Sequence, residues 1–123
     1  MITIMKELLT KWITALEKEV SLQQGLVAFN FGLFESEDGC YAIYLAGAES
    51  YDKDDEDWAC DTAYQSQPLL LHDDRLSAMD WEEAQTAIAD AIKELLSKDF
   101  KDSCFSKKII TIGFDDGNLS RLQ

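Results

Sequence analysis

The chain has 123 residues, of which 46% are hydrophobic, and it includes six Phe, four Tyr and three Trp; its formal net charge at pH 7 is −13. That length suits one domain with a single hydrophobic core, and the apolar and aromatic content argues against intrinsic disorder in spite of the charge. A surface so anionic repels phosphate backbones and anionic lipid headgroups, so we expect no direct binding to nucleic acid or to a membrane.

An amphipathic helix is predicted near the N-terminus. Apolar residues follow steps of three and four from Met5 to Val20, and Glu7 and Lys11 form a favourable i,i+4 pair on the opposite face. Gly25 suits the position that follows a helix C-terminus, so we expect the helix to end near residues 23–24.

Two strands, residues 26–35 and 40–48, are predicted to form an antiparallel hairpin. Large apolar residues alternate along both of them, which is typical of strands with one face in the core. The four residues 36–39 suit a short connecting loop, in which Gly39 can adopt a positive φ. The large residues expected on the core face are Val27, Phe29, Phe31, Leu33, Tyr41, Ile43 and Leu45.

A long polar connection, residues 49–67, separates the hairpin from a short predicted strand at residues 68–71. Pro68 favours the beginning of that strand or a position at the sheet edge.

A second helix follows, with Asp80 as its N-cap and Glu83 three positions later, as in a capping box. The buried stripe of this helix is predicted to contain Trp81, Ala84, Ile88, Ala91, Ile92, Leu95 and Leu96.

A last strand is predicted at residues 107–114, followed by a turn at residues 115–118 and a tail that makes one helical turn. The element order is then α-β-β-(β)-α-β. We therefore expect a single acidic α+β domain over residues 1–123, with two helices packed on a mainly antiparallel sheet of three to four strands.

Most of the negative charge lies in the middle of the chain. Residues 25–80 contain thirteen acidic residues against Lys53 and Arg75, a net charge of −11. Within that region, residues 49–61 (the acidic segment) hold seven acidic residues around Lys53, and Trp58 and Cys60 lie among them. Carboxylates this close repel one another and cannot all be buried without partners, so the segment should lie at the surface. The residues expected to bind a partner are Tyr51, Asp52, Asp54, Asp55, Glu56, Asp57, Trp58, Asp61 and Tyr64.

The acidic segment has other interpretations. It could be a solvated loop that serves only solubility, as charge runs often are. Trp58 either contacts a partner, as aromatic anchors of interfaces do, or turns inward and holds the loop against the core. A helix-loop-helix calcium site counted from Asp52 requires glycine and glutamate where Asp57 and Ala63 stand, which leaves only a looser cation site.

His72 is the single histidine, and it precedes Asp73 and Asp74. Pairing of His72 with Cys40, Cys60 or Cys104 remains open, but no sequence signature marks any of these residues as a nucleophile. The odd number of widely spaced cysteines favours reduced thiols over disulfides or a zinc site. We expect His72 to be a loop residue in a protein that has no enzymatic activity, cofactor or metal.

The location expected from the sequence is the cytoplasm. Lys6, Glu7 and Lys11 interrupt the apolar stretch that an export signal would need, and no run of residues is long and apolar enough to cross a bilayer.

This short acidic chain contains two stretches that invite comparison with known proteins. They are Tyr51-Asp52-Lys53-Asp54-Asp55-Glu56-Asp57-Trp58-Ala59-Cys60 and Ile112-Gly113-Phe114-Asp115-Asp116-Gly117-Asn118-Leu119. In these segments, in size and in composition, the chain resembles bacterial immunity proteins of polymorphic and contact-dependent toxin systems. The resemblance implies a cytoplasmic protein without enzymatic activity that binds one cognate toxin domain, often a nuclease, and blocks its active site.

The leading hypothesis is therefore an inhibitor that meets a basic protein partner through the acidic segment. Two rivals stay open. One is an adaptor or oligomerising subunit that joins another chain through an apolar face, and the other is a metal-binding protein, either a metal-dependent enzyme or a metal sensor, built from carboxylates and His72.

Overall fold

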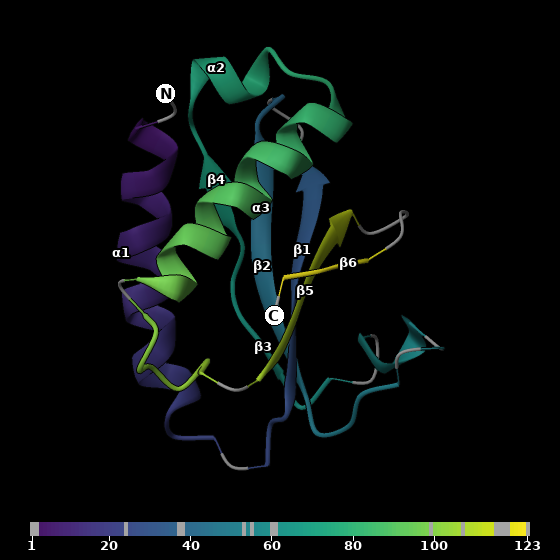
Figure 1. Ribbon diagram of the computed structural model, residues 1–123. Coiled ribbons are helices and arrows are strands. Elements are labelled where there is room, and N and C mark those ends of the chain that lie inside the picture. Colours follow the sequence, from purple (N-terminus) through teal and green to yellow (C-terminus); the bar gives the residue numbers. More distant parts are fainter. Residues whose placement is uncertain are drawn as a thin grey trace.

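The protein is a helix-and-sheet layer fold, seen here in a computed structural model (Figure 1). The structure describes residues 3–23, 25–36, 39–52, 54, 56–59, 62–98, 100–106, 108–114 and 119–122. The elements in chain order are α1 (Thr3–Val20), β1 (Ala28–Glu35), β2 (Tyr41–Ala48), the 3₁₀ helix η1 (Glu56–Ala59), β3 (Tyr64–Gln65), β4 (Leu69–Leu71), α2 (Asp74–Ser77), α3 (Trp81–Ser97), β5 (Ile109–Phe114) and β6 (Ser120–Arg121).

The strands form one sheet in the order β3-β2-β1-β5-β6, and β4 pairs with the other end of β2. β1 lies at the centre, antiparallel to β2 and parallel to β5. The remaining pairs are antiparallel, so the expected α+β class with a mainly antiparallel sheet is confirmed. The sheet has six strands rather than three or four, because β3 and β6 contain two residues each and such short strands carry no readable periodicity.

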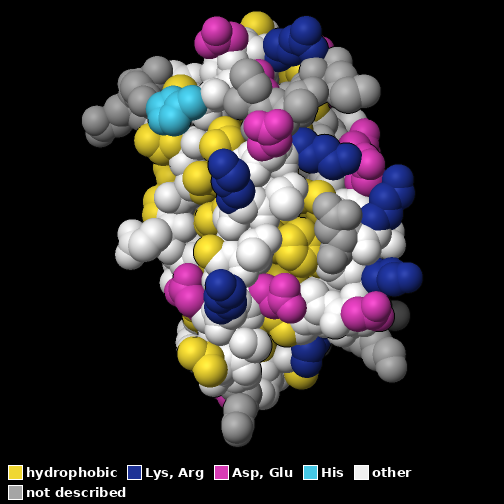
Figure 2. Space-filling model, turned by 90° about the vertical axis from the view of Figure 1, so that its left-hand side faces the viewer, with side chains coloured by type: hydrophobic (Ala, Val, Ile, Leu, Met, Phe, Trp, Pro, Cys, Tyr) yellow, Lys and Arg dark blue, Asp and Glu magenta, His cyan; other side chains and the backbone are white. Residues whose placement is uncertain are grey.

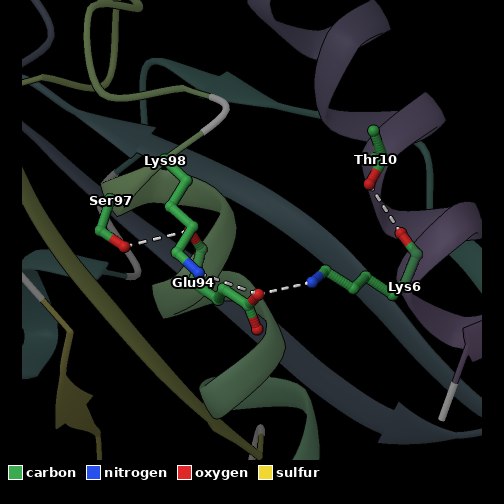
Figure 3. A network of polar contacts seen from close by, with 5 residues as sticks. All are labelled: Lys6, Thr10, Glu94, Ser97 and Lys98. Carbon is green, nitrogen blue, oxygen red and sulfur yellow. Dashed lines mark hydrogen bonds and ion pairs between the residues drawn. The ribbon is translucent and has the colours of Figure 1, made fainter. Parts of the chain in front are cut away.

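The long helices α1 and α3 both cover the same face of the sheet, with α3 crossing it diagonally (Figure 1). The main core lies between these helices and the sheet, and α1 and α3 are also joined at the surface. Lys6 Nζ of α1 lies 2.7 Å from Glu94 Oε1 of α3, and Lys98 Nζ lies 3.5 Å from the same oxygen (Figure 3). The hydrogen bond from Lys6, its charge and that of Lys98 lower the pKa of Glu94.

The opposite face of the sheet carries small and polar residues alongside aromatic rings. Thr111 Oγ1 donates a buried hydrogen bond of 2.9 Å to Asn30 Oδ1, and these two residues are partners in the β1–β5 ladder. On β1, Gly32 has no side chain, and a Cβ there would lie 2.2 Å from Cζ of the Tyr44 ring. The ring of Tyr44 therefore occupies the space that a side chain at residue 32 would need.

Several local expectations differ from the structure. α1 ends at Val20, earlier than expected, although Gly25 and Gly39 do have positive φ values. Val27 is exposed, because β1 begins only at Ala28. The tail forms the strand β6 and not a helical turn, and the predicted turn at residues 115–118 lies outside the described residues.

The N-cap prediction for α3 is confirmed: Asp80 is its N-cap, and the Asp80 carboxylate accepts a 2.8 Å hydrogen bond from the backbone N–H of Glu83. The prediction that Trp81 belongs to the buried stripe is wrong, since this residue is 51% exposed. Its ring packs edge-on against Phe114 at the end of the sheet, with the centroids 5.8 Å apart. Of the described helices, none is long and apolar enough to cross a membrane.

Candidate functional site

The acidic segment runs from the end of β2 to the start of β3 and contains the short helix η1. Asp52 and Asp54 are exposed, and the Asp52 carboxylate accepts a 2.9 Å hydrogen bond from the backbone N–H of Asp54. This local bond is typical of an Asx turn, which shapes the loop without removing either carboxylate from water. Of the other residues expected to bind a partner, Asp55 and Asp61 and the side chains of Glu56 and Asp57 lie outside the described residues.

Trp58 faces inward. It is 7% exposed and packs against Ala28 and Ala48, on the face of the sheet opposite the helices. The two alanines leave room for the large indole ring, and the three residues form a second apolar cluster apart from the main core. Of the two orientations that the sequence left open for Trp58, the structure has the one in which the residue holds the loop to the sheet.

Tyr51 extends this second cluster toward the surface. Its ring lies edge-on to Trp58, with the centroids 5.2 Å apart, and the guanidinium carbon of Arg121 lies 5.6 Å from the Tyr51 ring centroid. A cation over an aromatic ring is attracted by the ring quadrupole. The beginning of the acidic segment is thereby joined to Trp58 on one side and to β6 on the other.

Tyr64 belongs to a different surface. It lies on β3 and packs against the main core on the helix side of the sheet. Its hydroxyl donates a 3.5 Å hydrogen bond to the Glu19 carboxylate of α1, and burial together with that carboxylate raises the pKa of Tyr64. The structure therefore brings Tyr51 and Trp58 together but places Tyr64 away from them.

A second acidic surface, which the sequence analysis did not single out, lies along α3. An open hollow of about 490 Å³ there is lined by the carboxylate-bearing residues Glu82, Glu83 and Asp90, with Met79, Thr86 and Ala87. The spacing of these residues by three and four already places them on one helical face, so the sequence contained a signal for this surface. The exposed Trp81 stands at the beginning of the same helix.

Basic and acidic side chains are mixed on the face of α1. Figure 2 shows the face that α1 presents, where Lys and Arg alternate with Asp and Glu. The exposed Lys11 and Lys18 lie on α1, and the exposed Lys93 lies on α3. The acidic segment, by contrast, has Lys53 as its one basic residue against seven acids.

The described residues contain no group of three or more His, Cys, Asp and Glu side chains arranged to hold a metal ion. His72 follows β4 and is exposed, as expected for a loop residue. Its Nδ1 lies 3.3 Å from Cys40 Sγ, so of the three possible Cys–His pairs the structure contains this one. Cys60 lies outside the described residues, and Cys104 contacts the Glu17 carbonyl oxygen of α1 instead.

The acidic segment therefore presents carboxylates at the surface, on a loop that the buried Trp58 holds in place. Comparison of the chain with protein-family models, curated proteins and solved structures finds no match in any of the three.

Proposed function

We propose that this protein is a non-enzymatic, cytoplasmic inhibitor of the immunity-protein type. It binds a cognate toxin domain that has a basic surface, such as a nuclease, and the acidic segment provides the contact. The observation that supports the proposal most directly is the anchoring of this segment by the buried Trp58, with Asp52 and Asp54 exposed.

Anchoring matters because a fixed loop loses less conformational entropy on binding than a free one. Trp58, in contact with Ala28, Ala48 and Tyr51, ties the middle of the segment to the sheet. Its role in this proposal is to position the carboxylates, and the carboxylates meet the partner. This differs from the role of a contact residue that the sequence first suggested for Trp58.

The concentrated negative charge would act mainly on the rate of association. Complementary charge can raise on-rates to about 10⁸–10⁹ M⁻¹s⁻¹ at low salt, and salt screens the effect. The mixed charge on the α1 face gives a basic partner less attraction there. A basic cleft approaching the protein is therefore oriented toward the acidic segment.

The proposal predicts that the reading frame directly upstream of this gene encodes a toxin-like domain, and that domain, purified as an inactive variant, is the partner for the binding measurements. We expect the double variant D52N/D54N to associate roughly three- to tenfold more slowly than the wild type at low salt. Its rate should also depend less steeply on salt concentration, because two fewer charges attract the partner. Stopped-flow or surface plasmon resonance measurements over a salt series give both quantities.

The matched control is E82Q/E83Q, which removes the same number of charges from exposed residues of α3. We expect its association rate to stay within about twofold of the wild type, because these charges lie away from the contact. Equal slowing by both double variants would show that only net charge matters. Slowing by E82Q/E83Q alone would move the contact to α3 and remove the acidic segment from the mechanism.

A second candidate function, that of an oligomerising subunit, is supported by Trp81. An indole that is 51% exposed beside Phe114 resembles the aromatic anchors of interfaces. If this surface joins two copies, the wild type should dimerise with rising concentration in sedimentation velocity experiments, and W81A should remain monomeric. A wild-type chain that stays monomeric at about 100 μM, a concentration that favours interfaces of micromolar affinity, would exclude this candidate.

A further inference from the structure

Cys40 and His72 face one another across the end of a strand pair. The β2–β4 ladder pairs Tyr41 with Leu71, so the next residues outward, Cys40 and His72, stand opposite each other. Cys40 Sγ lies 3.3 Å from His72 Nδ1, within the range of a sulfur–nitrogen hydrogen bond. The register of the sheet therefore produces this contact, although 31 other residues of the chain lie between the two.

The backbone is held on both sides of the pair. The carbonyl oxygen of Cys40 accepts hydrogen bonds from the backbone N–H of Ser36, at 2.8 Å, and from Ser36 Oγ, at 3.0 Å. His72 is followed by the buried Asp73, whose carboxylate caps α2. Because the backbone is fixed at both residues, the Cys40 thiol and the His72 imidazole stay within hydrogen-bonding distance.

The pair is also accessible. Cys40 is partly exposed and His72 is exposed; the histidine appears in cyan at the surface in Figure 2. Cys104 provides a contrast within the same chain. Its Sγ lies 3.8 Å from the Glu17 carbonyl oxygen, and burial raises the pKa of the Cys104 thiol.

We propose that Cys40 and His72 form a reactive thiol pair, a site at which Cys40 is modified by low-molecular-weight disulfides. An imidazole beside a thiol is the arrangement that activates cysteine, because the ring nitrogen accepts the proton that the sulfur must lose before it reacts. This site is separate from the acidic segment and does not depend on the inhibitor function.

The reaction is a thiol–disulfide exchange. His72 Nδ1 accepts the proton of the Cys40 thiol, and the Cys40 sulfur attacks one sulfur of a disulfide R–S–S–R. The new bond joins Cys40 to that sulfur as the S–S bond of the reagent breaks. An alkyl thiolate that departs takes up the proton from His72 and leaves as R–SH; an aromatic thiolate leaves as the anion, and the proton passes to water. Cys40 is oxidised and the departing sulfur is reduced, so no further oxidant is needed.

Other charged groups near the pair do not share this role. The Asp73 carboxylate accepts hydrogen bonds from the backbone N–H groups of Met5, Arg75 and Leu76, so it is directed into the fold. Asp74 is exposed and follows in α2, and Glu35 is exposed on β1 opposite Tyr41. Neither carboxylate has a hydrogen bond to Cys40 or His72 among the described contacts.

The test uses the full chain with the substitutions C60S and C104S, so that Cys40 is the one remaining thiol. The probe is 5,5′-dithiobis(2-nitrobenzoate), an aromatic disulfide whose released thiolate is followed by absorbance. An ordinary thiol with a pKa near 8.5 is only about 3% ionised at pH 7. Complete ionisation could therefore accelerate its reaction with the disulfide by at most about thirtyfold. Because more acidic thiols are weaker nucleophiles, we expect H72Q to react about tenfold more slowly than the parent.

A matched variant separates the imidazole from general charge effects. D74N, which alters the neighbouring exposed charge, should react within about twofold of the parent. Oxidised glutathione, followed by mass spectrometry, should add one glutathione to Cys40 in the parent faster than in H72Q.

Equal rates for the parent and H72Q at pH 7 would overturn the proposal, and so would equal slowing by D74N. If the double serine background fails to fold, the wild-type chain serves in its place, with the modification of each cysteine measured by peptide mass spectrometry. In that experiment Cys40 should be modified before Cys104, and H72Q should reduce the difference in rate. Modification of Cys104 first would likewise contradict the assignment.

Discussion

Replacing Trp58 with alanine is expected to lower the free energy of unfolding by about 3 kcal/mol, near the lower end of the range for tryptophan-to-alanine changes in cores. Trp58 is 7% exposed, and its contacts with Ala28 and Ala48 form most of the apolar cluster on the face of the sheet opposite the helices. Alanine leaves a cavity that these small neighbours cannot fill. Guanidinium denaturation followed by far-ultraviolet circular dichroism measures the loss.

Two variants separate burial from the mere presence of an indole. W58F keeps most of the apolar volume and should cost only about 1 kcal/mol, since smaller changes in core volume cost less. W81A removes a tryptophan that is half exposed and packs against Phe114, so it should also cost about 1 kcal/mol or less. A loss below 1 kcal/mol for W58A would mean that the second cluster does not stabilise the cooperative fold.

The same substitution bears on the proposed inhibitor. If Trp58 positions the acidic segment, then W58A should slow association with the toxin domain even under conditions in which the protein stays folded. Unchanged association kinetics in folded W58A would show that the carboxylates act from an unanchored loop. The effect of anchoring is thus distinguishable from the effect of charge, which D52N/D54N measures.

The parts of the fold that follow from local patterns could be predicted from the sequence. α3 is an example, because Asp80 and Glu83 mark its beginning and apolar residues repeat along its length. The hairpin of β1 and β2 is another, since both strands alternate and Gly39 supplies the positive φ in the connecting loop. In each case the residues that determine the structure are neighbours in the chain.

Features that depend on distant contacts could not be predicted in this way. β5 lies parallel to β1, a pairing between segments about eighty residues apart that no local pattern specifies. Trp81 continues the apolar periodicity of α3, yet this first residue of the helix packs against Phe114 at the end of the sheet and stays half exposed. Apolar periodicity indicates which side of a helix faces the core, but it does not indicate where along the helix the sheet beneath it ends.

In the candidate site, too, local features could be predicted from the sequence and features that depend on distant contacts could not. The surface position of Asp52 and Asp54 follows from the repulsion between clustered carboxylates, which the sequence alone reveals. The inward orientation of Trp58 depends on Ala28 and Ala48, which come together only when β1 and β2 pair. The contact between Cys40 and His72 likewise depends on the register of β4 against β2.

Replacing Asp73 with alanine is expected to lower the free energy of unfolding by about 2–3 kcal/mol, since it removes a helix cap and leaves buried N–H groups without partners. One oxygen of this buried carboxylate accepts hydrogen bonds from the N–H groups of Arg75, at 2.9 Å, and Leu76, at 3.4 Å. The other accepts from the N–H of Met5 in the first turn of α1, at 3.2 Å. One side chain thus caps α2 and ties α1 to it.

Serine at residue 73 distinguishes the two roles of Asp73. Its hydroxyl can cap α2 but is too short to reach Met5, so D73S should recover about 1 kcal/mol of the loss caused by alanine. D80A is the matched control: the exposed Asp80 caps only α3 through the Glu83 N–H, and its loss should cost about 1 kcal/mol. Urea denaturation of the four proteins orders these costs. If D73A costs no more than D80A, the hydrogen bond to Met5 contributes nothing measurable, and α1 is held by its apolar face and its other polar contacts, such as the ion pair to Glu94.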